Sequence, residues 1–339
     1  MRPPLYGLEA GRRRRRRRRL PALRLPPLAA VALVLVAVIA AGSAFVAYRL
    51  WPLTDRSAGV IGPPVPKGHH THGASPQAAL PLRPLSAPSE SRVHIPGVRV
   101  SAGILVDSAS GSVLWGHEVH RKLPIASLTK LMTALLVVEH TTPKEPVLIT
   151  PDAIHYTGSG VGLLPEGKHV SVKALLYGLL LPSGNDAAIA LADHVAHTQK
   201  RFVAMMNDKA RSLGLRCTHF ASPHGLEPGN RSCPADLAAL ARIDLHHSRI
   251  ATVVRSAHAI VRFPIKGGKL YLNNTNPLLR MGYPGTIGLK TGDTDDAGHC
   301  LIAVVRHGPL TIAVVLLHSP NTQQQARVLL NKAFRVDRG

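Results

Sequence analysis

Paired apolar runs at the two ends of a long folded region dominate the pattern of hydrophobic and polar positions. The first pair, "VSAGILVDSASGSVLWGHE" (residues 100–118), breaks at a Ser/Gly turn at 108–111. The second pair, "HCLIAVVRHGPLTIAVVLLHS" (299–319), breaks at His307-Gly308. Two β-rich runs around a short turn signal indicate a β-hairpin. We therefore expect a hairpin near each end of this region.

Between the hairpins, the spacing of apolar residues is helical. One stripe consists of Leu128, Leu131, Leu135 and Val138, and another of Phe202, Met206 and Ala210. Further helical segments are predicted at 175–181, 187–195 and about 322–334. Strands at both ends with helices between them favour an antiparallel sheet built from the two termini, flanked by helices and carrying a helical insert.

An uncharged run, "LAAVALVLVAVIAAGSAFVAY" (28–48), precedes the folded region. Its length as a helix is roughly 30 Å, which matches the hydrocarbon core of a bilayer. We predict a transmembrane helix there, with residues 1–27 as a cytoplasmic tail because basic residues stay inside. A cleaved signal peptide, cut after Ala44, is the alternative, but the apolar run exceeds the usual length of about 7–15 residues.

Residues 49–95 are rich in Pro, Ser, Gly, Ala and His and have few large apolar side chains. Such a composition cannot bury enough surface to fold, so we predict a disordered linker. Residues 96–339 then form one globular domain. The anchor and linker predict a cell-membrane protein whose folded domain lies outside the cytoplasm, or a secreted form if the segment is cleaved.

The formal net charge of +22 raises the question of nucleic-acid binding. Eight of the 41 basic residues form one arginine run, 12–19, shortly before the apolar segment. No aromatic residues are interleaved with it, as stacking on single-stranded bases would require. We interpret the run as a topology signal that also attracts anionic lipid, and we predict no nucleic-acid partner.

A serine and a lysine stand three positions apart in "PIASLTK" (124–130), at the start of the first helical stripe. Ser127 and Lys130 would therefore lie on one helical face, within reach of each other. A serine hydroxyl is a weak nucleophile until a base takes its proton. Lysine can be that base only if burial and a second cation lower its pKa.

Two later stretches supply the missing groups. "LPSGNDAA" places Ser183 and Asn185 in a break between helical segments, and "GTIGLKTGDT" places Lys290, Thr291 and Gly292 on a strand-like segment. Each motif alone is better explained as a helix cap, a turn or a solvated strand residue. The three together, in this order, favour a catalytic site.

With these motifs in place, the chain resembles the serine-type D-alanyl-D-alanine carboxypeptidases among the low-molecular-weight penicillin-binding proteins. The likeness runs from about residue 100 to 317 and includes "LLLPSGNDAAIALA", "FVAMMNDKARSLGL", "THFASPHGL" and "NNTNPLL". It implies an α/β (α+β) fold with a five-stranded antiparallel sheet, flanking helices and an all-helical subdomain. It also implies removal of the terminal D-Ala from peptidoglycan stem peptides, with β-lactams as covalent inhibitors and no metal or cofactor.

Carried over by position, the resemblance makes Ser127 the acylated nucleophile and Lys130 its general base. Ser183 would pass a proton to the leaving D-alanine nitrogen. Asn185 would hold both the substrate amide and Lys130.

On the strand, the resemblance assigns Lys290 and Thr291 to the substrate carboxylate, and Gly292 to close approach of the substrate backbone. Backbone N–H groups of Ser127 and Asp293 would stabilise the oxyanion, at about 3–4 kcal/mol each. Asp293 departs from the family pattern, because a carboxylate beside a developing oxyanion is unfavourable. It predicts a functional but slower site.

Three cysteines lie in the exported part, where oxidation is permitted. Cys217 and Cys233 flank the "THFASPHGLEPGNRS" loop. A disulfide there would contribute about 3 kcal/mol, and the sequence leaves both the bonded and the free form open. Cys300 is expected to be a buried small residue.

Two other functions stay open. A class A-like β-lactamase needs a glutamate for its deacylating water, and the Glu227 to Asn230 segment is one residue too short for that loop. A non-catalytic cell-wall-binding scaffold would use the same cleft without acylation. The chain ends soon after its predicted last helix, so we expect attachment to the membrane through the N-terminal segment rather than through a C-terminal anchor.

Overall fold

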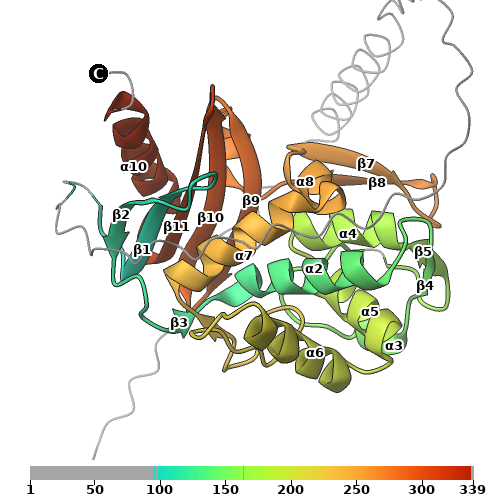
Figure 1. Ribbon diagram of the computed structural model, residues 1–339. Helices are drawn as coiled ribbons and strands as arrows, with labels where there is room; N and C mark the ends of the chain where they lie inside the picture. Colours follow the sequence, from blue (N-terminus) through green and yellow to red (C-terminus); the bar gives the residue numbers. More distant parts are fainter. Residues whose placement is uncertain (1–94, 96–97, 163, 337–339) are drawn as a thin grey trace, which may run out of the picture. The chain divides into compact units, whose positions relative to one another are not determined.

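The computed structural model describes Ile95 and residues 98–162 and 164–336. Its centre is an antiparallel sheet in the order β2-β1-β11-β10-β9 (Figure 1). The strands are β1 (Ala102–Asp107), β2 (Val113–His117), β9 (Thr286–Thr294), β10 (Gly298–His307) and β11 (Leu310–Ser319). Five strands in this arrangement confirm the predicted sheet.

Both predicted hairpins are present, and they meet in the middle of the sheet. β1 pairs with β2 on one side and with β11 on the other, and β11 pairs with β10. The turn between β10 and β11 follows His307, which lies opposite Leu310. The first and last strands of the domain are thus neighbours, as the two apolar pairs predicted.

Alternating residues of the central strands face two different layers. Leu105, Leu301 and Leu316 pack with the C-terminal helix α10 (Thr322–Val336), whereas Ile104 and Ile302 belong to the core shared with the other helices. In Figure 1, α10 lies on one side of the sheet and the helical part lies on the other. Because both faces are covered, the strands consist of nearly continuous apolar residues.

The helical part is inserted between β2 and β9. Its helices are η1 (Ala126–Thr129), α2 (Lys130–His140), α3 (Pro151–Ile154), α4 (Val172–Leu180), α5 (Asn185–Ala196), α6 (Gln199–Ser212), α7 (Pro234–His246), α8 (Ser248–Val254) and α9 (Pro277–Arg280). α2 is buried over most of its length and contacts α4, α5, α6, α7 and α8. The predicted stripes and the segments near 175–181 and 187–195 are therefore confirmed as helices.

Three small two-stranded sheets are additions that the hydrophobic pattern did not predict. They are β3 (Leu123–Pro124) with β6 (Arg231–Ser232), β4 (Pro146–Leu148) with β5 (His169–Ser171), and β7 (His258–Arg262) with β8 (Lys269–Asn273). Two or three residues are too few to show a period, so only the β7–β8 hairpin could have been recognised. β3–β6 ties the segment before η1 to the chain that precedes α7.

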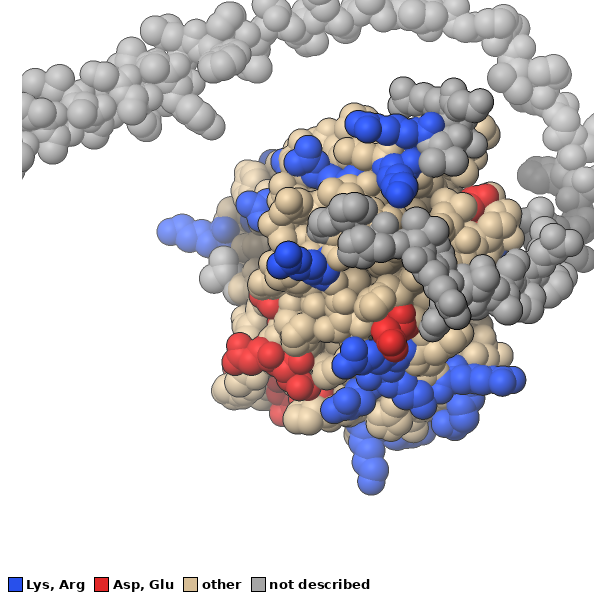
Figure 2. Space-filling model, turned by 90° about the vertical axis from the view of Figure 1, so that its left-hand side faces the viewer, with Lys and Arg blue, Asp and Glu red and all other residues tan. Residues whose placement is uncertain are grey.

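The predicted tail and transmembrane helix (1–48) lie outside the described residues, as does all of the predicted linker (49–95) except Ile95. Ile95 is buried against the sheet face that carries α10. Within the described part of the chain, no helix is both long and apolar enough to cross a membrane. The face shown in Figure 2 carries separate groups of basic and acidic side chains.

Candidate active site

Ser127 lies in a 3-10 turn, not in the first turn of an α-helix as the stripe predicted. η1 covers Ala126 to Thr129, and α2 begins at Lys130. Ala126 has a φ of 46°, a left-handed conformation that non-glycine residues rarely adopt. The tight turn still leaves the two side chains in contact, because Lys130 Nζ lies within hydrogen-bond distance of Ser127 Oγ, at 2.8 Å.

The amine of Lys130 is completely buried among three oxygen atoms. Besides Ser127 Oγ, it contacts Asn185 Oδ1 at 2.6 Å and the carbonyl oxygen of His224 at 2.8 Å. These partners come from η1, α5 and the loop before β6. The site thus depends on three segments that are far apart in the sequence.

Burial lowers the pKa of Lys130 well below its usual 10.5, and the charge of Lys290 lowers it further. Asp186 and Glu227 act in the opposite direction and are weaker causes. Burial also lowers the pKa of Lys290 to about 7. Burial is the cause of this second shift. Both causes that the sequence argument required for Lys130 are therefore present.

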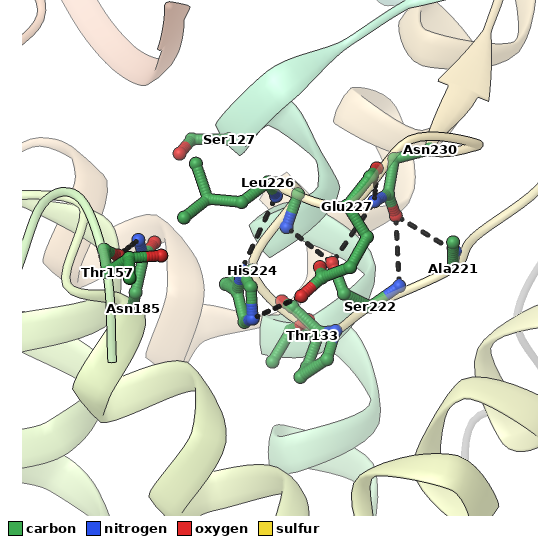
Figure 3. A network of polar contacts seen from close by, with 12 residues as sticks. Ser127, Thr133, Thr157, Asn185, Ala221, Ser222, His224, Leu226, Glu227 and Asn230 are labelled. Atoms are coloured by element: carbon green, nitrogen blue, oxygen red, sulfur yellow. Dashed lines mark hydrogen bonds and ion pairs between the residues drawn. The ribbon is translucent and has the colours of Figure 1, made fainter. Parts of the chain in front are cut away.

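The loop from Ala221 to Asn230 supplies the His224 carbonyl, and Asn230 holds its shape (Figure 3). Asn230 Oδ1 accepts the N–H of Ser222 at 3.2 Å, and its Nδ2 donates to Ser222 Oγ and to the Glu227 carbonyl. Ser222 Oγ also accepts the N–H of Gly225 at 2.9 Å. The loop is therefore closed by its own side chains.

The ring of His224 is buried and fixed in one orientation. Nδ1 accepts the N–H of Leu226 at 3.4 Å, so the ring proton lies on Nε2, which is 3.4 Å from Glu227 Oε1. Burial lowers the pKa of His224 to about 4, and Glu227 opposes this shift. The ring is therefore neutral at neutral pH, and its contacts fix the backbone carbonyl that meets Lys130.

The same loop is fastened to η1 and α2. Thr133 Oγ1 donates to the Pro223 carbonyl at 2.6 Å. Gly225 has a φ of 96°, and a Cβ atom there would lie 2.1 Å from the carbonyl oxygen of Ala126. Only glycine allows this close approach of the loop to the nucleophile's turn.

The break between α4 and α5 holds the second motif. Asn185 donates its Nδ2 to the Thr157 carbonyl at 2.6 Å, which turns its Oδ1 toward Lys130. The carboxylate of Asp186 accepts the N–H of Val161 at 2.8 Å. Ser183 is 7% exposed and has a φ of 68°, a strained position of the kind that clusters at functional sites.

β9 carries the third motif past η1. Lys290 Nζ donates to the Thr291 carbonyl at 2.9 Å, and Thr291 Oγ1 lies 2.7 Å from Thr275 Oγ1. A Cβ atom on Gly292 would lie 2.7 Å from the Ile125 carbonyl oxygen, so no larger residue fits against the turn. The lysine is 1% exposed, so its amine lies in a dry wall of the site.

Asp293 points away from this wall. Its side chain is 67% exposed, and Oδ1 lies 3.0 Å from Nδ1 of His299, its partner across the β9–β10 ladder. The carboxylate is therefore solvated, and a protonated His299 would neutralise it. This geometry reduces the electrostatic cost expected from the departure at position 293.

Cys217 and Cys233 form a disulfide with a Cα–Cα distance of 5.6 Å. It closes a segment of the chain that contains the whole loop from Ala221 to Asn230. Cys300 is a buried free thiol on β10, as expected from its apolar surroundings.

Comparison with known proteins decides the family. A family model described as D-alanyl-D-alanine carboxypeptidase matches residues 89–321, more than half of the chain. The chain belongs to this family. The carboxypeptidase DacF of Bacillus subtilis is 35% identical over 242 residues, which cover 69% of this chain and 61% of that protein. The chain spans 61% to 63% of the length of three such curated relatives.

Solved structures agree with this family assignment. A Streptomyces DD-transpeptidase has a TM-score of 0.67 and 32% identity, covering 72% of this chain and 100% of its own. A D-alanyl-D-alanine carboxypeptidase from Mycobacterium tuberculosis also has a TM-score of 0.67, with 30% identity, covering 72% of this chain and 94% of its own. The fold is thus that of the D-alanyl-D-alanine carboxypeptidase family.

Several residues of this carboxypeptidase-family site had no role in the sequence analysis. Ser222, His224, Gly225 and Asn230 shape the loop beside the nucleophile, and Asp186 holds the segment near 161. "THFASPHGL" was quoted only as part of the family likeness. Its Pro-His-Gly run signals a turn, but nothing local shows that the turn contacts Ala126.

Proposed function

We propose that the chain is a membrane-anchored serine D-alanyl-D-alanine carboxypeptidase that removes the terminal D-Ala of peptidoglycan stem pentapeptides through an acyl-enzyme on Ser127. One observation carries the proposal. The fully buried amine of Lys130 lies 2.8 Å from Ser127 Oγ, with two further oxygen partners. Membership of the family supports the substrate class.

Hydrogen-bond counting explains how the amine acts as a base. A neutral amine has two N–H donors and one lone pair. The His224 carbonyl and Asn185 Oδ1 can only accept, and the bond from Asn185 Nδ2 to Thr157 keeps Oδ1 turned toward Lys130. These two oxygens use both N–H groups, so the lone pair faces Ser127 Oγ. Protonation of the amine would remove that lone pair.

Acylation then follows from the positions of the groups. Lys130 takes the proton of Ser127 as Oγ attacks the carbonyl carbon of the penultimate D-Ala. The peptide bond breaks, the transferred proton reaches the leaving nitrogen through Ser183, and D-alanine departs. N–H groups of Ser127 and Asp293 are assigned to the developing oxyanion.

Substrate selection rests on Lys290, Thr291 and Gly292 of β9. A buried cation at Lys290, beside the hydroxyl of Thr291, suits the terminal carboxylate that distinguishes an exopeptidase substrate. Gly292 leaves the strand edge open to the substrate backbone. A β-lactam that presents a carboxylate and a carbonyl in the same arrangement as the peptide would acylate Ser127.

Deacylation completes the cycle when water attacks the acyl carbonyl and restores the hydroxyl. Lys130, again neutral, is assigned as the base for this step. Glu227 is 48% exposed in its side chain and contacts His224, which does not favour a role as the lactamase base. We infer that penicillin is trapped rather than turned over.

Membrane attachment is proposed from residues 28–48 alone. The uncharged run and the preceding arginines support a single-pass anchor with the folded domain outside the cytoplasm. Deleting residues 1–48 should release the protein from the membrane fraction.

The decisive assay is the release of D-alanine from a stem pentapeptide, with Ser127→Ala as the matched variant. The proposal predicts release by the native chain and none by the variant. A β-lactamase would instead hydrolyse penicillin catalytically, and a scaffold would show no penicillin adduct on Ser127. Either result would replace the proposed function.

A further inference from the structure

A pocket of about 240 Å³ opens at the end of the sheet that carries the β1–β2 and β10–β11 turns, and it is rich in basic residues. It lies between the β1–β2 and β10–β11 turns, the end of α7, the residue after α8 and the start of β9. These elements meet at the upper end of the sheet in Figure 1. The residues that line it are Ser108, Ala109, Arg242, Leu245, His246, Arg255, Ile287, Arg306 and Thr311. We refer to it as the arginine pocket.

Three arginines and one histidine line this small volume, and among the described residues no acidic one lines it. Neither Arg255 nor Arg306 forms an ion pair with any described residue. Arg306 donates its Nε to Thr311 Oγ1 at 3.1 Å, and neither terminal nitrogen of its guanidinium bonds to a described group. Like charges gathered around a pocket repel one another, so the cluster favours a bound anion.

His246 also lines the pocket. Its Nδ1 donates to the Arg242 carbonyl at 2.6 Å, so the ring is held by the backbone of α7. Arg242 is 8% exposed, so its side chain forms a largely dry wall of the pocket.

The remaining walls suggest more than a bare ion. Ser108 Oγ is buried and has no hydrogen-bond partner among the described residues, whereas Leu245 and Ile287 are apolar. A hydroxyl left without a partner is unfavourable, and a ligand oxygen would supply one after rotation of the side chain. The apolar residues suit an organic substituent on the anion.

We propose that the arginine pocket binds the oxyanion of a phosphate ester. A carboxylate is satisfied by one bidentate arginine, whereas the several oxygens of a phosphate can use the exposed guanidinium groups of Arg255 and Arg306 together with nearby hydroxyls. Ile287 precedes Gly292 by five residues on β9, which places the pocket about 17 Å from the turn that carries Ser127. The site is therefore separate from the proposed active site.

Two carboxyl groups lie near enough to be considered. Asp107 accepts bonds from Ala109 N–H and Ser110 Oγ within its own turn. Asp244 is fully buried on α7, and burial raises its pKa well above its usual value, which favours its uncharged form. Neither lines the pocket.

The test uses the full chain in an uncharged detergent and follows hydrogen exchange of the turns 107–112 and 307–311 by mass spectrometry. Three ligands are compared with chloride at equal ionic strength: inorganic phosphate, glycerol 3-phosphate and phosphatidylglycerol in the micelles. When the ligand concentration is about ten times the dissociation constant, amides of these turns that exchange only after the ligand leaves should exchange about tenfold more slowly. Protection by soluble phosphates identifies a small ligand, and protection by the lipid alone identifies a headgroup.

Arg255→Gln and Arg306→Gln should each weaken binding about tenfold or more. Arg262→Gln removes the same charge from the exposed outer face of β7 and serves as the control. All variants share the arginine run 12–19, so its own affinity for phosphate cancels. Penicillin labelling of Ser127 should stay unchanged in all three and shows that they fold. No protection in the native chain, or an equal loss in Arg262→Gln, would overturn the proposal.

Discussion

Gly225→Ala tests whether the loop from Ala221 to Asn230 positions the catalytic amine. The new Cβ would lie 2.1 Å from the Ala126 carbonyl oxygen, whereas such contacts need about 3.5 Å. Loop and turn must therefore separate by about 1.4 Å, which moves the His224 carbonyl away from Lys130. A misplacement of this size can reduce a rate about 100-fold. The strained φ adds about 1–2 kcal/mol of destabilisation, and overpacking about 1–3 kcal/mol more.

The matched control is Gly229→Ala in the same loop. Gly229 has a φ of 106°, but its Cβ would lie 3.4 Å from the nearest atom, Ala221 Cβ. This variant carries the backbone strain without the clash. Stopped-flow acylation by a fluorescent penicillin gives the rates, and urea unfolding gives the stabilities. We expect Gly229→Ala to acylate at nearly the native rate. Equal rates for the two variants would refute the positioning role of the loop.

Three further predictions concern β9 and the disulfide. Lys290 must be protonated to bind a carboxylate, and its pKa is about 7, so kcat/KM for the peptide should fall as pH rises through about 7. A C-terminally amidated peptide should show no such fall. Identical pH profiles for the two peptides would count against this role of Lys290. Asp293→Ser should change the acylation rate less than about twofold, since the carboxylate is exposed and well solvated; a tenfold change would show that the side chain acts on the oxyanion. Replacing Cys217 and Cys233 by serine should cost about 3 kcal/mol of unfolding free energy in urea titration, and an unchanged midpoint would show that the closed loop does not constrain the unfolded chain.

Much of the fold could be predicted from the sequence because its strongest signals are local. The hairpins at 100–118 and 299–319 have long apolar runs around short turns, and the helices have clear stripes. Their pairing through β1 and β11 was expected because strands at both ends of the domain, with helices between them, favour one sheet built from the two termini. The short β3–β6 and β4–β5 pairs were beyond prediction, because two or three residues carry no period.

The candidate site was predictable only in part, for a related reason. Ser127, Lys130, Ser183, Asn185 and the β9 motif stand in recognisable short patterns. The His224 carbonyl is a backbone atom, however, and any residue type could provide it. Its importance depends on a tertiary contact between loops, and no spacing in the sequence shows that contact.

The protonation state of Lys130 is the most direct test of the account. With ¹³C-labelled lysine, the Cε signal of Lys130, assigned by its loss in Lys130→Arg, can be titrated by NMR in the native chain. We predict that the signal reports a neutral amine at pH 7.5 and titrates well below 10.5. A titration near 10.5 would mean that Lys130 is charged at neutral pH, and it would contradict the proposed activation of Ser127.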